Sequence, residues 1–149
     1  NILMILKSKS PKDTQNIAAK LAKKIAKSKL GRSAVVLALE GELGAGKTTF
    51  VKGFARALGI KSHITSPTFV LMKRYKLQMP NLVFLFHVDA YRLKNYHDLL
   101  PLGIKEVIAD SHNIVLIEWS DRVRPILPAK FIKIHIDHIN DKTRKIQIK

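Results

Sequence analysis

The sequence contains no cysteine, which excludes disulfide bonds and thiolate metal sites and is consistent with a cytosolic protein. It also has no apolar run near the roughly 20 residues that a membrane-spanning helix needs. Residues 1–6 are mostly apolar but carry neither a basic leader nor a small-residue cleavage site. We therefore expect a soluble, cytoplasmic protein that does not act at a membrane.

Acidic residues are scarce relative to basic ones. The chain has 27 Lys and Arg against 11 Asp and Glu, a formal net charge of +16 and a pI near 10.3. Such an excess is typical of proteins that bind a polyanion such as RNA. The codon bias of the source genome can produce the same composition, with the charges solvated on the surface. Charge alone leaves both interpretations open.

A glycine-rich stretch fits the phosphate-loop pattern G-x-x-x-x-G-K-[ST] at every fixed position. In such a loop, backbone N–H groups point at the α- and β-phosphates and the positive end of the next helix faces the same oxygens. Lys47 would reach the β- and γ-phosphates, and the Thr48 hydroxyl would bind Mg²⁺. An ordinary glycine turn is the alternative. The stretch consists of Gly41, Glu42, Leu43, Gly44, Ala45, Gly46, Lys47 and Thr48.

The surrounding pattern favours the nucleotide site. An apolar run over residues 34–39 precedes the loop, and residues 49–58 follow with helical spacing up to Gly59. Further along, strand-like runs alternate with helical ones, and residues 131–137 and 144–148 alternate like a hairpin. We predict one domain over residues 1–149, an α/β sandwich like that of P-loop NTPases. It has a mostly parallel central sheet flanked by helices and a C-terminal hairpin.

The remaining strands and helices have local signals. Ser10 and Pro11 predict the start of a helix, whose outward lysines could touch RNA or simply be solvated. A second helical stretch should be interrupted near Pro101 and Gly103. The other expected strands cover residues 2–6, 68–75, 82–89 and 113–118, and the outward lysines are Lys20, Lys23, Lys24 and Lys27.

Two apolar runs end in an acid. Residues 82–88 lead to Asp89, and residues 114–117 lead to Glu118. Ligands of open α/β sheets bind beyond the carboxyl ends of the strands, and Mg²⁺ prefers oxygen ligands. We therefore predict that both carboxylates face the phosphates. Either acid could instead cap the next helix or pair with Arg92 or Arg122.

The hydroxyls of Thr65, Ser66 and Thr68 lie where many nucleotide switches place the loop that senses the γ-phosphate, although Pro67 could simply begin a strand. Trp119 is interpreted as a core anchor rather than a stacking platform. The guanine-reading pattern Asn-Lys-x-Asp is missing, which favours ATP over GTP. The six histidines lack ligand spacing, which argues against a transition-metal site.

Four motifs together resemble those of the TsaE family of bacterial ATPases, also called YjeE, in the same order and over nearly the whole chain. The resemblance implies an ATPase needed for threonylcarbamoyladenosine formation on tRNA, which binds the TsaD–TsaB complex and meets tRNA through it. Its ATP hydrolysis would support repeated turnover. The motifs are the loop through Thr49, Thr65 to Phe69, His87 to Leu93, and Ile117, Glu118 and Trp119.

The resemblance also implies roles for single residues, with ATP and Mg²⁺ as cofactors. Residues 44–49 would surround the phosphates, Thr48 and Glu118 would hold Mg²⁺, and Asp89 would orient the attacking water. Catalysis would then depend on Lys47, Asp89 and Glu118, while Arg144 would approach the nucleotide from the C-terminal turn. Two features depart from the family: Ser120 replaces a common proline, and residues 26–33 form a longer, more basic loop.

Two other functions remain open from the sequence. One is a small-molecule kinase, with Arg122 and Arg124 as lid arginines. The other is a basic RNA-binding module with a vestigial nucleotide site. Phosphate transferred to a metabolite would favour the first, and tight tRNA binding that ATP does not change would favour the second.

Overall fold

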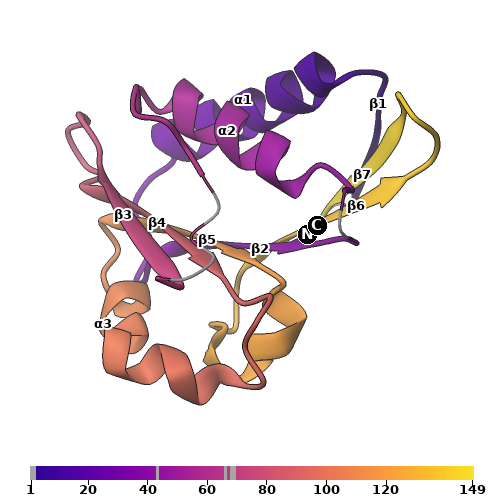
Figure 1. Ribbon diagram of the computed structural model, residues 1–149. Coiled ribbons are helices and arrows are strands. Elements are labelled where there is room, and N and C mark those ends of the chain that lie inside the picture. Colours follow the sequence, from indigo (N-terminus) through magenta and orange to yellow (C-terminus); the bar gives the residue numbers. More distant parts are fainter. Residues whose placement is uncertain (1–2, 43, 66, 68–69) are drawn as a thin grey trace.

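The computed structural model describes residues 3–42, 44–65, 67 and 70–149. Within these residues, seven strands form one sheet in the order β1-β7-β6-β2-β5-β4-β3 (Figure 1). The four inner strands β6, β2, β5 and β4 run parallel, and the strands outside them pair antiparallel. The strands are β1 (Met4–Ser8), β2 (Val35–Glu40), β3 (Met72–Lys76), β4 (Phe84–Asp89), β5 (Asn113–Glu118), β6 (Ile132–His138) and β7 (Arg144–Ile148).

Helices cover both faces of the sheet, so the predicted α/β sandwich is confirmed. The long helices α1 (Pro11–Lys27) and α2 (Lys47–Ala57) lie on one face, and α3 (Ile104–Ala109) lies on the other (Figure 1). The short 3-10 helices η1 (Tyr96–Leu102) and η2 (Ser120–Ile126) lie on the same side as α3, and η1 contacts both α3 and η2. Alternate residues of the central strands fill the two cores, because successive side chains of a strand point to opposite faces. Leu116 thus packs with α1 and α2, while Val115 and Ile117 pack on the α3 side.

The first helix begins where its capping residues predict. The Ser10 side chain accepts a hydrogen bond from the backbone N–H of Asp13 at 3.0 Å, and Pro11 stands at the first helical position. The Asp13 carboxylate in turn accepts from the N–H of Lys9 at 3.0 Å. This reciprocal pair satisfies the N–H of Asp13, which the helix itself leaves without a partner, and the N–H of Lys9 just before the cap.

A glycine allows α1 and α2 to approach closely. A Cβ atom on Gly53 of α2 would lie 2.5 Å from Cα and 2.6 Å from the carbonyl oxygen of Gln15 in α1. Ala18 and Ala22 of α1 are fully buried in the same core. This packing fixes α2, and with it the loop that precedes the helix.

Most predicted boundaries are correct to within two residues, and β5 matches at both ends. The strand expected over residues 68–75 is shorter, because Leu71 adopts a left-handed conformation with φ of 64° and β3 begins after it. The predicted interruption of the second helical stretch is confirmed, since Pro101 lies inside η1 and Gly103, with φ of 80°, separates η1 from α3. In the described residues, no helix is long and apolar enough to cross a bilayer.

Candidate functional site

The glycine loop connects the end of β2 to the start of α2, and glycine is required there by geometry. Gly41 has φ of 151°, and a Cβ atom on it would lie 2.6 Å from the carbonyl oxygen of Ile136 in β6. Gly44 and Gly46 also have positive φ, and Gly46 is the N-cap of α2 without a side chain to bond the helix. The N–H groups of the first turn of α2 are therefore available to an anion. Leu43 lies outside the described residues.

Lys47 is buried at the centre of the site, with an exposed fraction of 5%. Its ammonium donates to the carbonyl oxygens of Gly41 and Glu42, the latter at 3.0 Å, and lies 4.2 Å from the ring centroid of Trp119. Burial lowers the pKa of Lys47 below its ordinary value, while the negative charges of Glu118 and Asp89 act in the opposite direction. The predicted catalytic lysine is thus electrostatically coupled to both predicted acids.

Asp89 and Glu118 end the neighbouring strands β4 and β5 and are directly paired in register. Both are buried, with exposed fractions of 7% and 3%. The N–H of Ala90 donates to the Glu118 carbonyl, and the N–H of Trp119 donates to the carbonyl of Leu39 in β2, which ties the strand ends together. The two acids therefore lie at the edge of the sheet from which the glycine loop leaves.

Each carboxylate has a defined partner. Asp89 accepts from the backbone N–H of Tyr91 at 3.0 Å, so it stabilises the turn after β4. It does not cap the next helix, η1, whose N-cap is Asn95. Glu118 lies 2.5 Å from Nε2 of His87, and both side chains are buried. Sequence reasoning gave His87 no role of its own, although its position two residues before Asp89 puts both on the same face of β4.

The predicted hydroxyl ligands lie in two places. Thr48 and Thr49 are half-buried in the first turn of α2, directly after Lys47. Thr65 is exposed, and its hydroxyl accepts from the Lys73 ammonium of β3 at 2.8 Å. Ser66 and Thr68 lie outside the described residues. The structure therefore groups Thr48 and Thr49 with Lys47 and holds Thr65 against β3.

Arg144 reaches the loop from the first residue of β7. Its Nε donates to the Ala45 carbonyl at 3.0 Å and one of its terminal nitrogens donates to the Gly44 carbonyl at 3.4 Å. A further bond goes to the carbonyl of Asn140 in the hairpin turn at 2.7 Å. Arg144 thus braces the outer side of the loop backbone, and contact with a nucleotide remains a prediction.

Trp119 is half-buried rather than a pure core residue. It takes a left-handed conformation with φ of 58°, and its ring packs at the edge of the core on the α3 side. The ring of Tyr91 lies 5.0 Å from it, and the Arg122 guanidinium lies 5.7 Å from it. With Lys47 over the same ring, Trp119 connects the phosphate loop to the start of η2.

A hollow of about 800 Å³ adjoins the loop on the side of β6. Its walls combine loop residues with the ends of β2 and β6 and with residues of η2, and it is large enough for a small-molecule ligand. The lining residues are Glu40, Gly41, Glu42, Trp119, Asp121, Arg124, His135, Ile136, Asp137 and His138.

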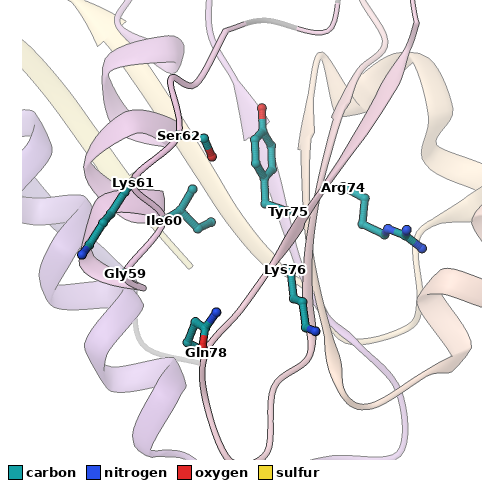
Figure 2. Close-up of a pocket in the computed structure, with 8 residues that line it drawn as sticks. All are labelled: Gly59, Ile60, Lys61, Ser62, Arg74, Tyr75, Lys76 and Gln78. Carbon is teal, nitrogen blue, oxygen red and sulfur yellow. The ribbon is translucent and has the colours of Figure 1, made fainter.

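A second hollow of about 690 Å³ lies between the segment after α2 and β3 (Figure 2). Figure 2 shows Tyr75 and Arg74 leaving β3 on opposite sides, as expected of neighbouring residues in a strand. None of the predicted site residues lines this hollow. This hollow is therefore separate from the predicted nucleotide site.

The family model for the threonylcarbamoyl adenosine biosynthesis protein TsaE matches residues 8–146, which include the loop, both acids and Arg144. The chain belongs to the TsaE family. This membership confirms the resemblance drawn from the four motifs.

Relatives in the TsaE family are similar along most of their length. The tRNA threonylcarbamoyladenosine biosynthesis protein TsaE of Treponema pallidum is 39% identical over 113 residues, 76% of this chain and 80% of the relative. That of Bacillus subtilis is 40% identical over 111 residues, 74% of this chain and 66% of the relative. That of Rickettsia bellii is 34% identical over 140 residues, 93% of this chain and 90% of the relative.

A solved structure agrees with this TsaE fold. The crystal structure of Bacillus subtilis YdiB superimposes with a TM-score of 0.76 at 33% sequence identity, covering 99% of this chain and 84% of YdiB. The roles of single site residues in this TsaE family member remain predictions.

Proposed function

We propose that this TsaE family member is a Mg²⁺-dependent ATPase that supports threonylcarbamoyladenosine formation on tRNA. It acts together with the TsaD–TsaB complex and contacts tRNA through that complex. The observation that carries the proposal is the convergence of Lys47, Asp89 and Glu118 at the end of a glycine loop.

Phosphate binding rests on the loop and the first turn of α2. The positive φ angles of the three loop glycines let the backbone curl around an anion, and the N-terminal N–H groups of α2 point along the helix axis toward it. The Lys47 ammonium adds a full positive charge in a desolvated position, where electrostatic attraction is stronger than in water. Arg144 keeps the loop in this shape from outside.

The residues present fit a magnesium ion shared with phosphates. Among the described residues, no group of three or more His, Asp and Glu side chains could hold an ion alone. Mg²⁺ in nucleotide sites takes one or two protein oxygens and completes its shell with phosphate oxygens and water. The Thr48 hydroxyl and the Glu118 carboxylate would supply those oxygens. When bound, the ion neutralises charge that develops on the phosphates.

Asp89 is the residue we propose to orient the attacking water. Its carboxylate is buried beside Glu118 and fixed by the N–H of Tyr91, so it presents a stable acceptor at the end of β4. Positioning the nucleophile and stabilising charge account for most of the catalysis of phosphoryl transfer.

Water is favoured over a metabolite as the phosphate acceptor. In a kinase, Arg122 and Arg124 would serve as lid residues. Arg124 is exposed and lines the hollow beside the loop. The Arg122 guanidinium, however, donates to the carbonyl of Leu93 at 3.4 Å and lies 5.6 Å from the Tyr91 ring. Arg122 therefore packs against the turn that follows β4.

The lysines of α1 form an exposed row on the side away from the sheet, which leaves their charge available to a polyanionic partner complex.

Phosphate release from ATP by the purified protein with TsaD, TsaB and tRNA tests the proposal. We expect Lys47→Ala to reduce turnover by about 100-fold or more, as loss of a single transition-state donor does. Lys52→Ala, which removes a lysine from the same helix, is the control and should keep wild-type turnover. Wild-type phosphate release by the Lys47→Ala protein would refute the proposal. Transfer of the terminal phosphate of ATP to an added small molecule, instead of to water, would favour the kinase.

A further inference from the structure

His87 is a buried histidine in direct contact with a predicted magnesium ligand. It lies in β4, next to β5 in the sheet (Figure 1), and has no exposed surface. Its Nε2 lies 2.5 Å from Oε2 of Glu118, whose side chain is also buried. The contact is therefore protected from water. A hydrogen bond in such a buried position is stronger than one at an exposed surface.

The surroundings of the other ring nitrogen, Nδ1, indicate which nitrogen carries the proton. Nδ1 of His87 is buried and has no hydrogen-bond partner among the residues that the structure describes. A proton on Nδ1 would leave a buried donor without an acceptor, which is unfavourable. The nitrogen that faces Glu118 is Nε2, so a proton on Nε2 has an acceptor, and from there it donates to the Glu118 carboxylate.

This bond determines what Glu118 can do. The carboxylate has two oxygens, and His87 engages Oε2, which restricts rotation of the group and leaves Oε1 as the oxygen for a metal ion or its water. The negative charge of Glu118 also acts on Lys47, so the carboxylate lies within the electrostatic reach of the phosphate loop. Removing a side chain that orients a metal ligand in this way commonly weakens the affinity of the site for the metal ion.

We propose that His87 is a positioning residue for Glu118: as an Nε2–H donor, it holds the carboxylate in the orientation that binds Mg²⁺ at the phosphate loop. The inference rests on the proposed function, because it assigns a device to the same magnesium–nucleotide site. His87 itself touches neither the ion nor the nucleotide.

The experiment compares His87→Leu, which removes the donor at similar volume, with His87→Gln, which keeps an N–H donor. A fluorescent ADP analogue is titrated in EDTA and at increasing Mg²⁺ concentration. Mg²⁺ should strengthen binding of the analogue to the wild-type protein. In the His87→Leu protein, the Mg²⁺ concentration that gives half of this effect should rise by about 10- to 100-fold. The affinity for the analogue in EDTA should stay unchanged. His87→Gln should recover most of the Mg²⁺ response. His112→Leu, which replaces an exposed histidine, is the control and should match the wild type.

A second measurement uses the protein without metal or nucleotide, so it does not depend on the folding of a variant. Long-range ¹H–¹⁵N correlation spectra of the wild-type protein should show a proton on Nε2 of the His87 imidazole. A ring without a proton on Nε2 would overturn the inference. A His87→Leu protein with wild-type Mg²⁺ dependence would overturn it as well. If Mg²⁺ does not change the nucleotide affinity of the wild-type protein, both the proposed function and the inference are refuted. If Mg²⁺ raises the nucleotide affinity of the wild-type and His87→Leu proteins equally, the inference alone is refuted.

Discussion

The Nε of Arg144 donates to the carbonyl oxygen of Ala45 at 3.0 Å, joining two residues 99 positions apart in the chain. The same guanidinium bonds the carbonyl of Gly44 and the turn of the C-terminal hairpin. A loop whose N–H groups face inward has carbonyls that face outward, and Arg144 binds two of these. The hairpin thus helps to shape a loop that lies far from it in sequence.

We predict that Arg144→Ala weakens nucleotide binding by roughly 10-fold, because a charge-assisted bond of about 1.5–3 kcal/mol no longer braces the loop. Titration with a fluorescent ADP analogue measures the affinity. Lys145→Ala, one residue further along β7, removes a charge without this contact and is the matched control. Equal affinities of the Arg144→Ala and Lys145→Ala proteins would contradict the bracing role.

Gly41 and Gly44 should differ in their tolerance of alanine. A Cβ at Gly41 meets the Ile136 carbonyl oxygen at 2.6 Å, whereas a Cβ at Gly44 meets no heavy atom of the described residues within 4 Å apart from those of Gly44 and its chain neighbours. Both substitutions carry backbone strain of about 1–2 kcal/mol from positive φ. Gly41→Ala should therefore lower the free energy of unfolding by clearly more than Gly44→Ala does. Urea denaturation of the two variants measures this difference, and equal losses would show that the contact with β6 is unimportant.

The contact between α1 and α2 predicts a strong effect at Gly53. Alanine there would push its Cβ against the backbone of Gln15, at 2.5 Å from Cα, and overpacking of this kind costs about 1–3 kcal/mol. The midpoint of urea unfolding should fall accordingly. Lys52→Ala, at the neighbouring position of the same helix, should leave it nearly unchanged. A Gly53→Ala protein as stable as the wild type would mean that the two helices separate easily.

Tyr75 offers a test of the core beside the second hollow. Its hydroxyl is buried without a hydrogen-bond partner in the described part of the chain, so Tyr75→Phe should raise the free energy of unfolding by roughly 1 kcal/mol at pH 7. Burial also raises the pKa of Tyr75 above 10.0. The unfolded state then ionises first, so the wild type should lose further stability relative to Tyr75→Phe as the pH rises above 10. Urea unfolding at pH 7 and pH 10.5 measures both effects, and a Tyr75→Phe protein less stable than the wild type would contradict them.

Local chemistry made much of the fold predictable from sequence. The Ser10 cap, the glycine loop and the run that became β5 each depend on residues close together in the chain, and the structure confirms all three. Leu71 was not predictable in this way, because nothing in its residue type favours a left-handed conformation. The N–H of Asp89 donates to the Leu71 carbonyl, so the strand edge of β4 helps to hold that conformation.

The site was predictable only as far as motifs reach. Strand ends and the loop pattern brought Lys47, Asp89 and Glu118 together, which the structure also does. The bond between His87 and Glu118 depends on how β4 and β5 pair, and register cannot be read from either strand alone. The same holds for Trp119, whose contact with Lys47 arises from a turn conformation that the sequence did not indicate.

The most direct test is phosphate release by an Asp89→Asn protein in the presence of TsaD, TsaB and tRNA. We predict nucleotide affinity near that of the wild type and phosphate release slower by about 100-fold or more, because the buried acid that orients water is lost. Asp98→Asn, which changes an exposed acid in η1, should behave as the wild type. Undiminished phosphate release by the Asp89→Asn protein would contradict the central claim that this site hydrolyses ATP.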